Sequence, residues 1–255
     1  MSIPSRTGKI EVTTINDFLG DLDLEVGTDI IMGDFDLIGW HLASKVRNRE
    51  SENYNKYGAI FRPNYERGIL MHALIQKKGL FNILEIGFGR GYVTACSALA
   101  IYGMGVEGRV TTVDVAHDSN TLSVLNEVLE GNVSTMVDIN PVKSTSDEFF
   151  SNLEEGTKFD IIFIDGDHRY EYVKRDFENA VKHIDRGYIV MDDYHMPSKV
   201  DKDIEVANFV DSLPEKYSKK LIKTDRLIFA DDQRRSIDTL EYGMVLLPIG
   251  DIEDE

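Results

Sequence analysis

The sequence contains very little cysteine and no long apolar run. Cys96 is the only cysteine among 255 residues, which excludes an internal disulfide and a zinc site built from several cysteines. A single cysteine is also typical of the reducing cytoplasm, where we expect this protein. The first twelve residues have no apolar signal core. No stretch approaches the roughly 18 apolar residues of a membrane helix, so we expect no membrane partner.

Basic residues are scarce relative to acidic ones. The chain has 28 lysines and arginines against 45 aspartates and glutamates, a formal net charge of −17. A surface of this charge repels phosphate backbones, so we expect no nucleic-acid partner. The acidity itself indicates a solvated surface, because net charge keeps proteins soluble.

Strand and helix patterns alternate from about residue 64 onward. Apolar runs predict seven strands, at 81–86, 109–115, 133–137, 159–164, 187–191, 221–229 and 242–247. Helical periodicity predicts helices between them, at 64–78, 92–102, 119–130, 145–153, 170–184 and 203–213. This alternation predicts an α/β fold with a mostly parallel seven-stranded sheet and helices on both faces.

We divide the chain into an N-terminal extension, residues 1–60, and one α/β domain, residues 61–255. The extension shows no clean period, and we expect it to serve as a substrate lid or as a contact in a homo-oligomer. In open α/β sheets, ligands bind outside the carboxyl ends of the strands. The residues that directly follow each strand of the domain are therefore the candidates for function.

A glycine-rich loop follows the first strand of the domain, with the sequence EIGFGRGY at residues 85–92. Alternating glycines allow a sharp turn and a close backbone approach to a ligand, and the next helix presents free N–H groups. A dinucleotide fingerprint would place glycine or alanine where Tyr92 stands, which argues against a nicotinamide oxidoreductase. A carboxylate at Glu85 suits an ammonium group better than a phosphate. The predicted cofactor contacts in this loop are Glu85, Gly87, Phe88, Gly89, Gly91 and Tyr92.

Asp114 ends the second strand, where an acidic side chain accepts hydrogen bonds from ribose hydroxyls. Together, this loop and Asp114 resemble motifs I and II of class I methyltransferases, which bind S-adenosylmethionine (SAM), and the resemblance spans roughly residues 64–250. It implies a Rossmann-like SAM-dependent methyltransferase fold with SAM as cofactor. It further implies that Ser146 and Asp147 lie near the adenine.

Carboxylates follow two later strands of the predicted sheet. Asp165 follows the strand at 159–164, and Asp192 and Asp193 follow the strand at 187–191. If these strands are neighbours, their ends lie about 4.8 Å apart and the three carboxylates converge. Clustered carboxylate oxygens favour a hard divalent cation such as Mg²⁺. The alternative is that Asp192 and Asp193 belong to an ordinary acidic loop.

The segments FIDGDHRYEYVKRD and VMDDYH resemble metal-dependent O-methyltransferases that act on sugar hydroxyls of macrolides, and cephalosporin-hydroxylase-like proteins. The resemblance implies that Asp165, Asp192 and Asp193 bind Mg²⁺ or another divalent cation. It also implies that His168 is the general base, with Asp165 the second catalytic residue. The expected reaction is O-methylation of a small-molecule hydroxyl on a sugar or natural product. A metal-independent methyltransferase and a catalytically silent SAM-binding protein remain alternatives.

Overall fold

The computed structural model describes residues 2–4, 9–24, 65–89, 91–117, 119, 121–129, 133–195, 204–223 and 242–250. Most of the predicted N-terminal extension lies outside these residues. Among the described residues, no helix is both long and apolar enough to cross a membrane.

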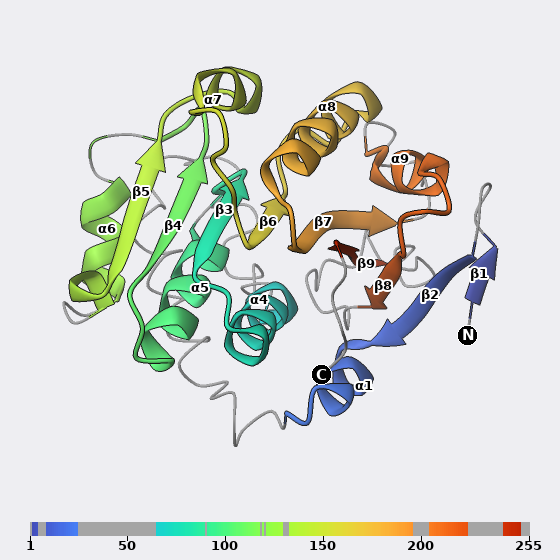
Figure 1. The fold of residues 1–255 in the computed structure, drawn as a ribbon, viewed down its shortest axis with the longest axis horizontal. Helices are drawn as coiled ribbons and strands as arrows, with labels where there is room; N and C mark the ends of the chain where they lie inside the picture. Colours follow the sequence, from blue (N-terminus) through green and yellow to red (C-terminus); the bar gives the residue numbers. More distant parts are fainter. Residues whose placement is uncertain are drawn as a thin grey trace, which may run out of the picture.

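A single sheet of nine strands forms the centre of the described molecule, in the order β1-β2-β8-β9-β7-β6-β3-β4-β5 (Figure 1). The strands are β1 (Ser2–Pro4), β2 (Lys9–Thr14), β3 (Asn82–Ile86), β4 (Gly108–Val113), β5 (Val137–Val142), β6 (Ile161–Ile164), β7 (Gly187–His195), β8 (Lys220–Lys223) and β9 (Tyr242–Ile249). Strands β3 to β7 are mutually parallel, and β9 runs antiparallel between β7 and β8. The predicted mostly parallel fold is confirmed.

Two strands from the N-terminal segment extend the predicted seven-stranded sheet. Strand β2 pairs in parallel with β8, and β1 pairs antiparallel with β2. The short helix α1 (Ile15–Asp21) follows β2, and Thr14 caps its first turn. The described part of this segment therefore belongs to the same sheet as the domain, and its role as a lid or oligomer contact stays a prediction.

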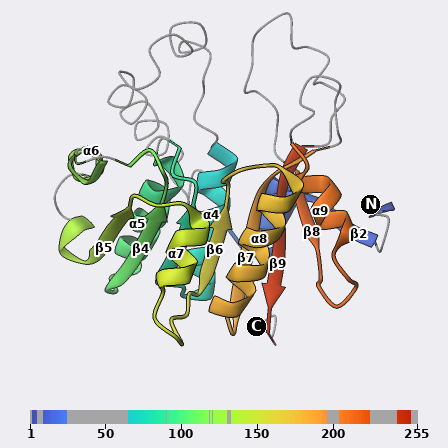
Figure 2. The same ribbon diagram turned by 90° about the horizontal axis from the view of Figure 1, so that it is seen from above.

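Helices cover both faces of the sheet, as expected. One apolar core includes side chains of α1, α4 (Tyr65–Lys78) and α5 (Tyr92–Gly103), together with α6 (Thr121–Val128). The second core includes α7 (Ser146–Asn152), α8 (Tyr170–Ala180) and α9 (Val206–Ser212). Figure 2 looks onto the face that α7 and α8 cover. Single turns of 3₁₀ helix lie at Val133–Thr135 and Val181–His183.

The structure differs from the prediction at two strands. The edge strand β5 begins at Val137, where the predicted strand ended, and it contains Pro141. Proline is tolerated there because an edge strand needs only one row of ladder bonds. Strand β7 does not end at Met191 but continues to His195, pairing with β9 across a bulge between Met191 and Tyr194.

The order of the strands places a ligand crevice between β3 and β6. From β3 the chain moves outward through β4 to β5, and then crosses back to β6 on the other side of β3. Such a reversal leaves an opening at the carboxyl ends of the two central strands. The glycine loop follows β3 and Asp165 follows β6, so both predicted sites lie at this opening.

Candidate active site

The glycine loop after β3 adopts a backbone that favours glycine. Gly87, Gly89 and Gly91 have φ angles of 91°, 52° and 78°. A Cβ at Gly87 would lie only 2.0 Å from the backbone oxygen of Asp165, so the loop and the β6 terminus are in direct main-chain contact. A Cβ at Gly89 would meet no described atom within 4 Å, which leaves the outer side of the loop open to a ligand.

Glu85 lies on β3 beneath this loop and is almost fully enclosed, with 2% of its surface exposed. The hydroxyl of Thr94, in the first turn of α5, donates to its carboxylate. Burial raises the pKa of Glu85 to about 8, although the hydrogen bond from Thr94 acts in the opposite direction. A carboxyl of this kind ionises readily when a cationic group of a ligand is placed beside it.

Asp114 follows β4 and holds the glycine loop. Its Oδ2 accepts hydrogen bonds from the backbone N–H groups of Phe88 at 2.9 Å and Gly89 at 3.3 Å, and its Oδ1 accepts one from Ala116 at 2.7 Å. The ring of Phe88 is buried against His117, with ring centroids 4.6 Å apart. The predicted ribose-binding carboxylate therefore also fixes the backbone of the loop.

The remaining predicted cofactor residues lie apart from the loop or turn away from it. Tyr92 begins α5, and its ring packs close to Gly68 of α4. Ser146 and Asp147 begin α7, where Asp147 forms an ion pair with Arg175 at 2.9 Å. Ser146 instead bonds to the buried Asp176, whose pKa burial raises to about 6.

Three predicted site residues meet at the ends of β6 and β7. His168 Nε2 lies 3.3 Å from Asp165 Oδ1 and 3.0 Å from Asp193 Oδ2. One ligand atom from each of these residues lies within 4.8 Å of the others, and all three side chains are half-buried. The two carboxylates of this cluster are oxygen ligands that fit a hard divalent cation, and the imidazole lies beside them. Strands β6 and β7 are neighbours, which is the condition under which the sequence placed these carboxylates together.

Hydrogen bonds to the two carboxylates raise the pKa of His168 to about 10. The bond to Asp165 contributes most, followed by the bond to Asp193, while partial burial acts in the opposite direction. In the protein alone, the imidazole therefore carries a proton at neutral pH. The proton acceptor role predicted for His168 requires the charge of these carboxylates to be balanced by another cation.

Asp192 does not join the three-residue cluster. It is 1% exposed, and its Oδ2 contacts the Nε of Arg67 on α4, whose Nη2 lies 2.9 Å from Asp193 Oδ1. Burial raises the pKa of the Asp192 carboxyl well above its usual range, although the Arg67 guanidinium acts to lower it. Arg67 was not predicted from the sequence, because a charge at the start of a helix usually faces solvent.

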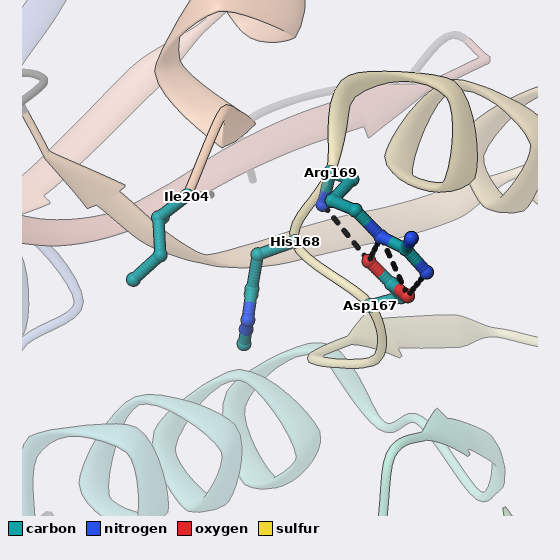
Figure 3. A pocket seen from close by; sticks show the side chains of 4 residues that line it. All are labelled: Asp167, His168, Arg169 and Ile204. Carbon is teal, nitrogen blue, oxygen red and sulfur yellow. Dashed lines mark hydrogen bonds and ion pairs between the residues drawn. The ribbon is translucent and has the colours of Figure 1, made fainter. Parts of the chain in front are cut away.

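A cavity of about 460 Å³ opens beside the cluster, lined by Asp167, His168, Arg169 and Ile204 (Figure 3). Arg169 Nε donates to both oxygens of Asp167, at 2.9 and 3.1 Å. Figure 3 shows this pair turned away from the His168 ring. The wall of the cavity therefore presents His168 and the apolar Ile204.

Glu205 joins the start of α9 to the His168 segment. Its backbone N–H donates to the carbonyl of His168 at 2.8 Å, and its carboxylate accepts from the N–H of Tyr170 at 2.9 Å. Tyr170 begins α8, so Glu205 supplies the cap that this helix lacks from its own Arg169. No sequence pattern connected Glu205 with His168, because they are distant along the chain.

Comparison with known proteins agrees with this arrangement. Residues 84–194 match the sequence model of a family described as a methyltransferase domain. The matched residues run from β3 to β7, and so contain both the glycine loop and the Asp165–His168–Asp193 cluster. The predicted resemblance to class I methyltransferases is confirmed. No curated protein matches the sequence.

Solved structures of methyltransferases share the fold of this domain. The O-methyltransferase TomG from Streptomyces achromogenes, involved in tomaymycin synthesis and solved with SAM, has a TM-score of 0.56 and 18% identity over 82% of this chain and 90% of that chain. An O-methyltransferase from Bacillus cereus, solved with S-adenosylhomocysteine, has a TM-score of 0.54, 18% identity and the same coverages of 82% and 90%. The Podospora anserina methyltransferase PaMTH1 has a TM-score of 0.50 and 15% identity over 85% of this chain and 88% of that chain.

Proposed function

We propose that this protein transfers the methyl group of SAM to a hydroxyl of a small molecule, with the help of a divalent cation. The observation that carries the proposal is the contact between the glycine loop and the Asp165–His168–Asp193 cluster. Gly87 lies against the backbone of Asp165, so a cofactor on the loop and an acceptor at the cluster would be neighbours. Methyl transfer needs this proximity, because sulfur, methyl and oxygen must align.

In this proposal, Glu85 and the glycine loop hold the amino-acid part of SAM, and Asp114 holds the ribose. Glu85 is an enclosed carboxylate that suits the ammonium group, and the outer side of Gly89 is open. Asp114 already orders the loop through Phe88 and Gly89, so it would support the cofactor both directly and through the backbone. The SAM and S-adenosylhomocysteine complexes of the structural neighbours support this choice of cofactor.

The cavity beside His168 is the proposed acceptor site. Its volume of about 460 Å³ is that of a small-molecule pocket. Asp165 and Asp193 would hold the cation, and a bound divalent cation lowers the pKa of an adjacent hydroxyl. His168 would then accept the hydroxyl proton. We leave Asp192 out of the predicted ligand set, because it is buried against Arg67.

A metal-independent methyltransferase is the second candidate, and Arg67 favours it. Its guanidinium already contacts both Asp192 and Asp193, and so balances part of the acidic charge without a metal. In this alternative, the cluster would orient the acceptor through His168 alone. The acidic cluster would then have no need of a bound ion.

Two measurements test the proposal. Calorimetry with S-adenosylhomocysteine should detect one site, and a glycine-loop variant, Gly89→Leu, should abolish it, because the side chain would fill the open space beside the loop. Turnover of labelled SAM on a panel of catechols, sugars and phenols should then be measured with Mg²⁺ and with EDTA. Activity that EDTA leaves unchanged would favour the metal-independent alternative, and unchanged binding by Gly89→Leu would contradict the cofactor site.

A further inference from the structure

The two adjacent acids at the end of β7 have different surroundings. Asp192 is 1% exposed, whereas Asp193 is 14% exposed and contacts His168. A divalent cation that keeps some of its water needs room beside its ligands. The enclosed carboxylate of Asp192 does not offer that room.

Arg67 contacts one carboxylate oxygen of each of these two acids. Its Nε contacts Asp192, and its Nη2 lies 2.9 Å from Oδ1 of Asp193. The other oxygen of Asp193, Oδ2, lies 3.0 Å from His168 in the cluster. The guanidinium of Arg67 on α4 therefore contacts both carboxylates. One oxygen of Asp193, Oδ2, faces His168 in the cluster.

The backbone of β7 makes this double contact attainable. In a regular strand, neighbouring side chains point to opposite faces of the sheet. Here the register of β7 against β9 shifts between Met191 and Tyr194, and Asp193 has a φ of 54°, in the left-handed region. Such a backbone persists only where the surrounding contacts hold it in place. The contacts with Arg67 reach both residues of the bulge.

We propose that Asp192 is a positioning residue and not a metal ligand: its buried contact with Arg67 fixes the β7 bulge, so that Asp193 faces Asp165 and His168. This inference rests on the proposed function, because the site that is positioned is the proposed cation site. Asp165 and Asp193 are then the two carboxylate ligands. In some proteins, buried polar or charged groups contribute specificity of conformation in this way.

Titration of the full-length protein with Mn²⁺ alone, followed by electron paramagnetic resonance, tests the division of roles. The isosteric variants Asp193→Asn and Asp192→Asn form a matched pair. Asp193→Asn should weaken Mn²⁺ binding by about a hundredfold or more, whereas loss of an outer positioning contact in Asp192→Asn should weaken it by about tenfold. Arg67→Lys, which keeps the charge but not the two-pronged contact, is a second variant and should match Asp192→Asn.

A double variant, Arg67→Lys with Asp192→Asn, should bind Mn²⁺ no more weakly than either single variant, because both break the same contact. Affinity for S-adenosylhomocysteine reports whether each variant is folded. Equal loss of Mn²⁺ binding in Asp192→Asn and Asp193→Asn would make Asp192 a ligand. This result would overturn the inference but not the proposed function. So would an Asp192→Asn variant with lowered thermal stability but unchanged Mn²⁺ affinity. A wild-type protein that binds no Mn²⁺ would overturn the metal part of the proposed function and the inference with it.

Discussion

Glu85 is almost fully enclosed, and its proposed role is to bind a cationic group of the cofactor. Burial and a bound cation have opposite effects on the protonation of its carboxyl. Burial favours the neutral carboxyl and raises its pKa to about 8. The ammonium of SAM favours the carboxylate. A protein whose Glu85 is protonated must therefore release that proton before or as SAM binds.

The affinity for SAM should consequently depend on pH. We expect it to rise between about pH 6 and 8, by at most about tenfold per pH unit, and to level off above pH 8, where Glu85 is already ionised. Calorimetry across this range measures the effect, and Glu85→Gln, which has no proton to lose, is the control. If the affinity of the wild type for SAM varies with pH as little as that of Glu85→Gln, Glu85 does not bind the ammonium group.

The same shift predicts how folding stability depends on pH. The pKa of Glu85 is raised from its ordinary value of 4.5 to about 8 in the folded protein. The folded state therefore holds this proton more tightly than the unfolded state. Its stabilising effect is complete below pH 4.5 and declines as pH rises towards 8. In the absence of ligand, the melting temperature of Glu85→Gln should fall less steeply over this range than that of the wild type.

His168 contacts two carboxylates, and its removal should separate catalysis from metal binding. We expect His168→Ala to lower kcat by about 10²- to 10⁴-fold, the usual contribution of a general base. Affinity for Mn²⁺ should change little, because the proposed ligands are Asp165 and Asp193. Single-turnover rates and Mn²⁺ titration measure the two effects. Loss of Mn²⁺ binding comparable to that of Asp165→Asn would instead make His168 a ligand.

At the scale of elements, Glu205 links the start of α9 to the start of α8. Its carboxylate accepts from Tyr170, and its N–H donates to His168. Glu205→Ala should destabilise the protein by about 1 kcal/mol, the usual cost of losing a helix cap. It should also lower kcat without affecting affinity for S-adenosylhomocysteine, because the cofactor loop lies on the other side of the crevice.

Thermal unfolding and steady-state kinetics measure these effects of Glu205→Ala. A matched control is Thr145→Ala, which removes the cap of α7 at a similar cost but does not contact His168. If the two variants lose stability equally and both keep full kcat, Glu205 acts only as a cap.

The strands that the sequence predicted best are those buried on both faces. The run at 161–164 is entirely apolar, and such runs identify a central parallel strand without reference to tertiary contacts. The edge strand β5 was placed too early, because its exposed positions alternate with buried ones and Pro141 interrupts the pattern. The strand predicted at 187–191 ends before the polar end of β7, because a bulge has no signature in hydrophobic periodicity.

Among the site residues, the sequence predicted only those that directly follow a strand. The positions of Asp165 and Asp193 depend on neighbouring strands, and the sequence indicated this juxtaposition. The separation of Asp192 from Asp193 depends on Arg67, which reaches them from α4. Contacts between segments so distant along the chain leave no local pattern, so the sequence does not predict this part of the site.

For the whole molecule, the net charge of −17 is a source of self-repulsion. Raising the ionic strength from 0.01 M to 1 M shortens the screening length from about 30 Å to about 3 Å. We expect the melting temperature to rise by about 3 °C or more, the shift that 1 kcal/mol gives in a chain of this size.

Calorimetry in NaCl measures this rise. The double variant Glu154→Lys and Glu155→Lys, at exposed positions before β6, reduces the net charge and should show a smaller rise. A melting temperature that is independent of salt, or a variant that responds as strongly as the wild type, would contradict the electrostatic explanation.

Strand β2 lies between β1 and β8, and its partner β8 is made late in the synthesis of the chain. Glu11 pairs with Lys220 of β8, so a ribosome must add about 200 residues after β2 before the partner strand exists. At the usual rates of 5 to 20 residues per second, β2 waits roughly 10 to 40 seconds before the backbone groups on its β8-facing edge can pair. Strands β3 to β7 can assemble during that interval. The crevice with the glycine loop and the acidic cluster can therefore form first. Strands β1 and β2 join the edge of the sheet afterwards, although they are synthesised first.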